Sequence, residues 1–141
     1  MFLGEFEYRI DEKGRVPMPP RFRKELADGL VLAPGVDRCI AGYSLEEWSR
    51  QAEKVTNASI APSKRRRLGR AFFGSANNLA LDGQGRVSLP ASLREYAHIG
   101  EDLVVVGVNT YFELWNKELW AAEKVLAEEQ AWQITEGLEE R

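Results

Sequence analysis

The chain contains one motif twice, at a fixed separation. The segment 11–23, DEKGRVPMPPRFR, returns 71 positions later as segment 82–94, DGQGRVSLPASLR. Asp, Gly, Arg, Val, Pro and a final Arg stand in register in the two copies. After a one-residue shift, segment 43–48 likewise corresponds to segment 115–120. The chain is therefore two copies of one unit, and a surface that one copy presents to a partner can be presented again by the other.

A length of 141 residues suits two small units that share a core. Pieces of about 60 residues bury too little surface to be comfortably stable alone, so we expect the halves to pack together. The sequence predicts a first repeat at 1–56, a linker with a basic helix at 57–76, and a second repeat with a C-terminal helix at 77–141.

Composition narrows the class of protein. With 44% hydrophobic and 29% charged residues the chain is globular, and no apolar run approaches the ~20 residues that span a bilayer. The first five residues do not resemble an export signal, so we expect a cytoplasmic protein with no membrane partner. Cys39 is the single cysteine and His98 the single histidine, which implies no disulfide, no metal site and no cofactor.

Charge is distributed unevenly. The net charge is −3, but residues 1–80 carry 14 Lys and Arg against 10 Asp and Glu, whereas residues 81–141 carry 5 against 12. Most of the acidic excess lies in the last stretch of the chain. A basic face elsewhere can still attract phosphates, so net charge does not exclude nucleic acid as a partner.

Hydrophobic patterning predicts about four strands in each half. Residues 6–10 alternate apolar and charged side chains, which is typical of a strand with one buried face. A strand, a tight Asp-Gly turn and a second strand are expected at each motif. The apolar runs 30–33 and 103–106 predict buried strands, and 39–41 and 111–114 follow turn signals, so they should return antiparallel.

Helices are predicted from capping signals. Proline at a first helical position favours short helices from Pro20 to Leu26 and from Pro90 to Ala97. Ser44 with Glu47 forms a capping box for a helix to about residue 55. Asn116 should cap a helix that runs to about residue 131. The four tryptophans have matched or helical positions, which favours packing in cores and interfaces over stacking on unpaired bases.

The repeated Asp-x-x-x-Arg spacing has a physical use. Because the two ends of a tight turn lie close together, Asp11 can accept hydrogen bonds from the turn backbone or from the Arg15 guanidinium. Asp82 and Arg86 can do the same. An arginine held at the rim of a sheet offers a planar fork of donors to phosphate oxygens or to guanine in the major groove.

The neighbouring residues differ between the two turns. Lys13 adds charge in the first, and Gln84 at the same place in the second adds an amide that can read adenine. The alternative is that each Asp and Arg form only an exposed pair, worth ~0 to 1 kcal/mol and needing no ligand. Repetition favours the functional interpretation, although duplication also copies structural turns.

A second basic feature is the run Lys64, Arg65, Arg66 and Arg67, at the start of a short predicted helix. Four cations near a helix N-terminus oppose the helix dipole, so the placement gives no local gain in stability. Three interpretations stay open: a contact to DNA phosphates, a subunit contact to the acidic C-terminal tail, or a solvated helix face.

The chain resembles the MraZ family of bacterial transcriptional regulators over almost its whole length. The resemblance lies in segments 11–19 and 82–90, in the joint FFGSA at 72–76, and in FELW at 112–115. Two departures are visible: residue 73 is Phe where the family often has Ser before Gly, and Gly83-Gln84 replaces a more charged turn. Neither departure touches the motif arginines.

The resemblance implies an α+β, β-rich fold of two tandem swapped-hairpin units of the AbrB type, arranged as a pseudo-symmetric double β-barrel with flanking helices. It implies a cytoplasmic, nucleoid-associated regulator that forms a ring-shaped homo-oligomer. Its partner would be double-stranded DNA with short direct repeats, upstream of its own operon for cell division and cell-wall synthesis. The family's DNA-binding motif falls on Asp11, Arg15, Asp82 and Arg86.

Two other function classes compete with a DNA-binding regulator. A ring-forming scaffold without specific DNA binding is compatible with the tryptophan-rich helices. An enzyme is disfavoured because the sequence shows no nucleophile with a base, no Gly-rich phosphate loop and no placed carboxylate pair. We therefore expect no enzymatic activity and no small-molecule substrate.

Overall fold

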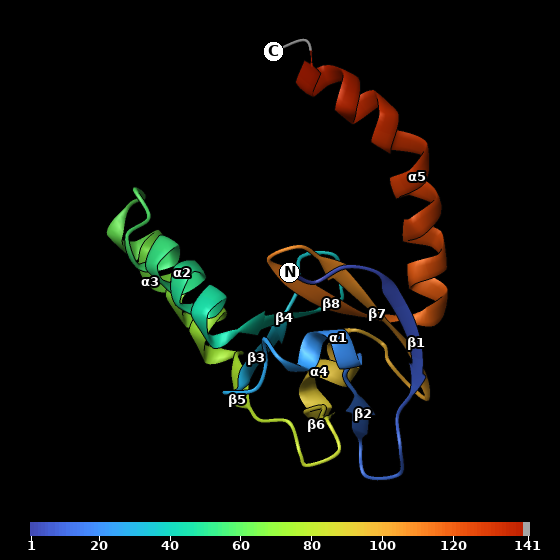
Figure 1. The fold of residues 1–141 in the computed structure, drawn as a ribbon. Helices are drawn as coiled ribbons and strands as arrows, with labels where there is room; N and C mark the ends of the chain where they lie inside the picture. The colour runs from blue at the N-terminus through green and yellow to red at the C-terminus, as the bar shows by residue number, and fades with distance from the viewer. Residues whose placement is uncertain (140–141) are drawn as a thin grey trace.

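The computed structural model describes residues 1–139 and has the predicted α+β, β-rich character (Figure 1). Its elements, in chain order, are β1 (Glu5–Arg9), β2 (Arg15–Pro17), α1 (Pro20–Arg23), β3 (Leu30–Pro34), β4 (Ile40–Ser44), α2 (Leu45–Thr56), α3 (Pro62–Gly74), β5 (Asn77–Leu79), β6 (Arg86–Ser88), α4 (Ala91–Tyr96), β7 (Asp102–Val108), β8 (Tyr111–Asn116) and α5 (Lys117–Glu139). Four strands therefore fall in each half, as the patterning predicts.

Six strands form one sheet in the order β1-β7-β8-β4-β3-β5, and β2 and β6 form a separate two-stranded ribbon. All pairings are antiparallel, including β3 with β4 and β7 with β8. Because β1 and β5 stand at opposite edges and do not pair, the sheet formed by residues 1–139 is open. The expected double β-barrel is not seen.

Strands of one half pair with strands of the other. β1 pairs with β7, β3 with β5, and β2 with β6. The predicted order of strand, tight turn and strand is present at each motif, but the strands that flank a turn do not pair with each other: β1 pairs with β7 and β2 with β6. The halves interlock and share one core, as their small size predicts.

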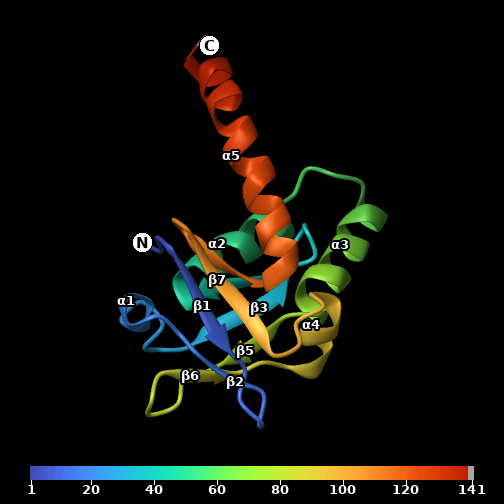
Figure 2. The same ribbon diagram turned by 90° about the vertical axis from the view of Figure 1, so that its right-hand side faces the viewer.

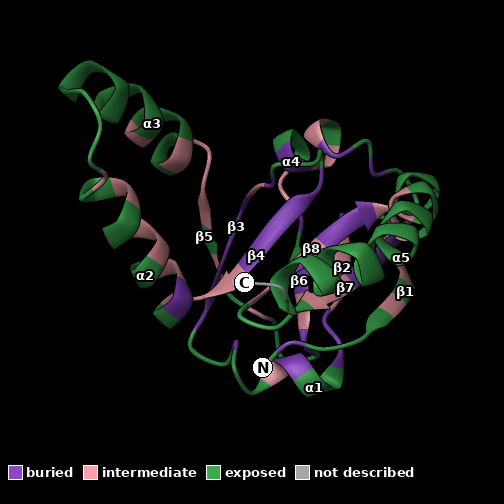
Figure 3. Cartoon of the chain, turned by 90° about the horizontal axis from the view of Figure 1, so that it is seen from above, coloured by how far each residue is buried: buried purple, intermediate pink, exposed green. Residues whose placement is uncertain are grey.

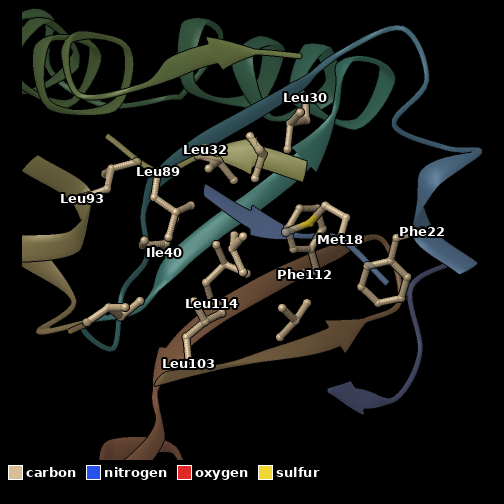
Figure 4. Close-up of a cluster of buried hydrophobic side chains, with 14 of the residues drawn as sticks. Met18, Phe22, Leu30, Leu32, Ile40, Leu89, Leu93, Leu103, Phe112 and Leu114 are labelled. Atoms are coloured by element: carbon tan, nitrogen blue, oxygen red, sulfur yellow. The ribbon is translucent and has the colours of Figure 1, made fainter. Parts of the chain in front are cut away.

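The core is built from matched positions of the repeat. Val16 and Val87 are 0% and 1% exposed, and Phe22 and Leu93 are 1% and 2% exposed. Figure 4 shows Phe22 and Leu93 in this core, with Phe112 among the side chains between them. The Phe112 ring lies directly over Gly42 of the neighbouring strand, where an added Cβ would stand 2.2 Å from the ring. Glycine is needed there because any side chain would displace that ring.

The helices begin where the capping signals predict. Ser44 Oγ accepts a hydrogen bond from the backbone N–H of Glu47 at 3.2 Å, and Asn116 Oδ1 accepts from that of Leu119 at 2.9 Å. Their ends differ from expectation: α1 already ends at Arg23, and α5 continues to Glu139. No helix among residues 1–139 is both long and apolar enough to cross a membrane.

Candidate nucleic-acid interface

The first motif forms a loop between β1 and β2 that is closed around one carboxylate. Asp11 Oδ1 accepts hydrogen bonds from the backbone N–H groups of Lys13 and Arg15, both at 2.9 Å. Asp11 Oδ2 accepts from Arg15 Nε at 2.8 Å. Gly14 completes the turn with φ of 76°, a conformation that a side chain disfavours. Because Nε is engaged by the aspartate, the outer nitrogens of the guanidinium remain as donors to a partner.

The second motif repeats this geometry between β5 and β6. Asp82 Oδ1 accepts from the backbone N–H groups of Gln84 at 2.9 Å and Arg86 at 3.0 Å, and Oδ2 accepts from Arg86 Nε at 2.9 Å. Gly85 has φ of 75°. Lys13 and Gln84 occupy corresponding positions in the two loops, and both residues are exposed. The structure therefore contains two copies of one arginine-presenting loop.

The β2–β6 ribbon holds the two loops together. Val16 stands opposite Val87 in the ribbon. The N–H of Met18 donates to Gly85 O at 2.9 Å, and the N–H of Leu89 donates reciprocally to Gly14 O at 2.8 Å. Both loops lie side by side at one end of the molecule, opposite the far end of α5 (Figures 1 and 2). Arg86 Nη1 also lies 3.8 Å from Asp11 Oδ2, which links the loops directly.

Two further arginines, for which the sequence predicts no role, lie against the loops. Arg23 comes from the first repeat, yet its guanidinium covers Gly85 of the second, and its Nε donates to Met18 O at 3.1 Å. Arg94 of the second repeat lies over Gly14 of the first. Both are the final, in-register Arg of the repeated motif. That register was the available signal, but only the crossed packing of the halves reveals what each arginine touches.

The two loop carboxylates are stabilised as anions. The N–H of Arg15 is the largest influence that lowers the pKa of Asp11, and the Arg15 guanidinium and the Lys13 N–H lower it further. The N–H of Arg86 likewise leads in lowering the pKa of Asp82. Hydrogen bonds to a charged carboxylate favour its ionised form. Each aspartate therefore stays ionised at neutral pH and holds its arginine in one direction.

The first loop borders an open cleft of about 710 Å³, lined by Arg9, Ile10, Asp11, Glu12, Lys13, Arg15, Arg94, Gly100 and Glu101. Four of these residues are basic and three are acidic, which suits a partner bound by placed hydrogen bonds more than by bulk charge. The side chains of Arg15 and Arg86 remain 29% and 26% exposed. Both guanidinium groups are thus partly accessible from solvent.

The basic run does not join this site. Lys64, Arg65, Arg66 and Arg67 occupy exposed positions in the first half of α3, far from the two loops (Figure 1). Arg65 has a local structural contact, because its Nε and Nη2 donate to Ala58 O and Ile60 O, both at 3.2 Å. The structure therefore separates the two basic features that the sequence suggested.

The other residues of interest in the sequence are the single cysteine and the tryptophans. Cys39 is fully buried, and burial together with the nearby Glu113 carboxylate raises the pKa of its thiol to about 12. Trp48 stacks on Phe72 with ring centroids 4.6 Å apart, which confirms packing between α2 and α3. Trp132, in contrast, is 76% exposed and does not pack in the core of its own chain, so an interface is the part of the prediction that still applies to it. Residues 1–139 contain no cluster of His, Cys, Asp and Glu that could hold a metal ion.

Comparison with known proteins gives a consistent assignment. The family model described as "MraZ protein, putative antitoxin-like" matches residues 1–71 and again residues 72–140. A protein of Dehalococcoides mccartyi strain BAV1 is 54% identical over 141 residues, covering 99% of both chains. One from Dehalococcoides mccartyi strain 195 is 52% identical over 140 residues, again with 99% coverage of both. One from Roseiflexus castenholzii is 42% identical over 120 residues, covering 85% of this chain and 84% of its own.

Each of these relatives is named transcriptional regulator MraZ. The class that the duplicated motif and the comparisons define is thus that of two-repeat transcriptional regulators. The chain belongs to the MraZ family.

Proposed function

We propose that this chain is a sequence-specific DNA-binding transcriptional regulator, and that the two loops at Asp11–Arg15 and Asp82–Arg86 read the DNA. The supporting observation is their matched geometry: each aspartate binds the Nε of an arginine, and among the described residues the outer guanidinium nitrogens make no hydrogen bond. A fork held in this way is pre-organised for the O6 and N7 acceptors of guanine or for phosphate.

The residues of the two loops have different roles in this proposal. Arg15 and Arg86 are the base-reading groups, Asp11 and Asp82 position them, and Lys13 contacts phosphate from the exposed turn. Gln84 replaces Lys13 in the second loop and can pair with adenine. The two loops therefore read different bases.

The target is double-stranded DNA with short direct repeats, upstream of the chain's own operon for cell division and cell-wall synthesis. A ring-shaped homo-oligomer would present the loop pair many times, so that each bound repeat raises the local concentration of the next. The functional units are a first repeat at 1–56, a linker with the basic helix at 57–76, and a second repeat at 77–141. Such a regulator is cytoplasmic and nucleoid-associated, and it needs no cofactor or enzymatic activity.

A ring-forming scaffold without specific DNA binding is the competing function. The observation in its favour is the exposed apolar surface of α5, where Trp132 is 76% and Leu138 is 63% exposed. Under this alternative the oligomer forms, but no duplex is preferred over any other.

Selection from random duplexes separates the two functions. The unmodified protein should enrich a spaced repeat, and the Arg15→Ala/Arg86→Ala protein should not. In titrations at fixed salt, loss of one base-reading arginine should weaken specific binding by about 1–3 kcal/mol, whereas Lys13→Ala should weaken binding to all sequences alike. In a series of salt concentrations, Lys13→Ala should reduce the slope of log K against log salt concentration by about 1. Lys54→Ala, on exposed α2, is the control for loss of one charge. Equal enrichment by both proteins would contradict the proposal.

A further inference from the structure

Helix α5 is anchored to the body only by its first turns. Trp120 Nε1 donates to Glu5 Oε2 at 3.2 Å, and Lys124 Nζ lies 2.9 Å from Glu5 Oε1. The Trp120 ring also packs on Trp115, with centroids 5.6 Å apart. From residue 125 to residue 139 every position is exposed, and Figure 3 colours this part of α5 as exposed. Figure 2 shows the helix standing away from the sheet.

The free part of α5 carries an acidic face with apolar side chains at its centre. Val125, Glu128, Glu129, Trp132, Glu136 and Glu139 follow one another at steps of one, three and four residues, which places them on one side of the helix. Val125 is 54% and Trp132 is 76% exposed. A face with this spacing is typical of a helix that packs lengthwise against another helix.

The charges of α5 and α3 are complementary and uncompensated. Within 117–139, α5 has six glutamates and two lysines, and both lysines already pair with Glu5 and Glu7 of β1. Helix α3 has five cations and no acidic residue. Among the described residues, neither the α5 glutamates nor the α3 cations take part in an ion pair. Exposed Leu68 and Phe73, at 40% and 42%, give α3 an apolar component as well.

The two helices lie on opposite flanks of the sheet, with α3 beside α2 at the left of Figure 1 and α5 at the right. They do not meet within one chain. Their lengths match, since 13 residues of α3 span about 20 Å and residues 125–139 of α5 span about 22 Å at 1.5 Å per residue. Complementary surfaces on opposite flanks join copies head to tail, and such contacts close into rings when the rotation permits.

We propose that residues 125–139 of α5 dock on α3 of the next copy of this chain. Val125 and Trp132 pack against Phe73 and the side-chain stems of Arg66 and Arg70 on α3. The glutamates on the same face of α5 lie toward Arg66, Arg67 and Arg70, which share one side of α3. This inference rests on the proposed homo-oligomer and names its interface. It also gives the basic run a partner other than DNA.

Charge reversal tests the contact. Arg66→Glu/Arg67→Glu and Glu128→Lys/Glu129→Lys should each reduce the mass in solution, measured by sedimentation, toward the 16.0 kDa of one chain. Combining all four changes restores opposite charges across the contact and should restore the assembly. Lys24→Glu, exposed at the end of α1 and without an ion pair among the described residues, is the matched control and should keep the full mass.

Cross-linking shows which helices meet. In a Cys39→Ser background, an Arg67→Cys chain mixed with a Glu129→Cys chain should form a disulfide-linked pair of the two variants. Cross-linking of Glu129→Cys to itself alone would instead indicate contact between two α5 helices and would overturn the inference. An unchanged mass after α3 reversal, or four changes that fail to restore it in folded protein, would overturn it too.

DNA binding provides a separate readout. Arg15→Ala/Arg86→Ala should keep the full mass while losing specific DNA, so failure of the DNA proposal leaves the interface test intact. If Arg66→Glu/Arg67→Glu weakens DNA binding with no change in mass, α3 belongs to the DNA surface and the inference is wrong.

Discussion

Arg94 of the second repeat lies over Gly14 of the first, with its Cζ 3.5 Å from the point where a Cβ on Gly14 would stand. Arg23 lies over Gly85 in the reverse sense, and there Nε, Cζ and Cδ stand 2.3–2.8 Å from such a Cβ. Each DNA-reading loop of the proposal is therefore supported by an arginine of the other repeat. The hydrogen bonds of each loop are local, whereas the side chain that covers its glycine comes from the other half.

Alanine at the two loop glycines should have unequal effects. The positive φ alone disfavours a side chain by roughly 1–2 kcal/mol at Gly14 and at Gly85. At Gly85 the added Cβ also displaces Arg23 and breaks its hydrogen bond to Met18 O. We expect Gly85→Ala to lower the free energy of unfolding more than Gly14→Ala does, in urea titrations.

Gly83→Ala is the control in the same loop, because no atom lies within 4 Å of its added Cβ and its φ is not positive. It should be close to neutral. A larger loss at Gly14 than at Gly85 would contradict the packing assigned to Arg23.

Acid should loosen both loops. Because hydrogen bonds from the Arg15 and Arg86 backbones lower the folded-state pKa of Asp11 and Asp82 below the ordinary 3.8, the loop contribution to stability is complete above that value. It is lost as the pH falls through the depressed folded pKa values. Carboxyl ¹³C NMR should show both midpoints below 3.8, together with a shift of the Arg15 and Arg86 Nε–H signals. Midpoints at or above 3.8 would mean that the carboxylates are not held as described.

The single thiol should be unreactive in the folded protein. Cys39 is 0% exposed, and burial, assisted by Glu113, raises the pKa of its thiol to about 12. Since the thiolate is the reactive form, an aromatic disulfide reagent at pH 8 should label native protein far more slowly than protein in denaturant. Equal rates would show that the β3–β4 turn opens readily.

The N-cap of α2 should contribute to stability. Ser44→Ala removes the acceptor for the Glu47 N–H and should lower the free energy of unfolding by about 1 kcal/mol, within the usual range of 0.5–2. Ser49→Ala, on the exposed side of the same helix, removes only a hydroxyl that donates to Leu45 O and should have little effect. Equal losses in thermal unfolding would argue against the cap.

Much of this architecture can be predicted from local sequence patterns. Alternation and apolar runs located the strands to within a few residues, and the capping residues Ser44 and Asn116 marked the starts of α2 and α5. The spacing of Asp11 and Arg15 also predicted their mutual hydrogen bond, because that contact joins the two ends of one tight turn. All of these features depend on neighbours a few residues apart, whose geometry follows from backbone stereochemistry.

The pairing of the halves was decided at long range. Nothing in the pattern of residues 5–9 specifies β7 as a partner, because any strand edge offers the same backbone donors and acceptors. The crossed ladders β1–β7, β3–β5 and β2–β6 arise from burying both apolar faces in one core, and they alone bring the two arginine loops together and place Arg23 over Gly85. The repeated sequence therefore predicts two similar arginine loops, whereas only the shared core brings these loops next to each other.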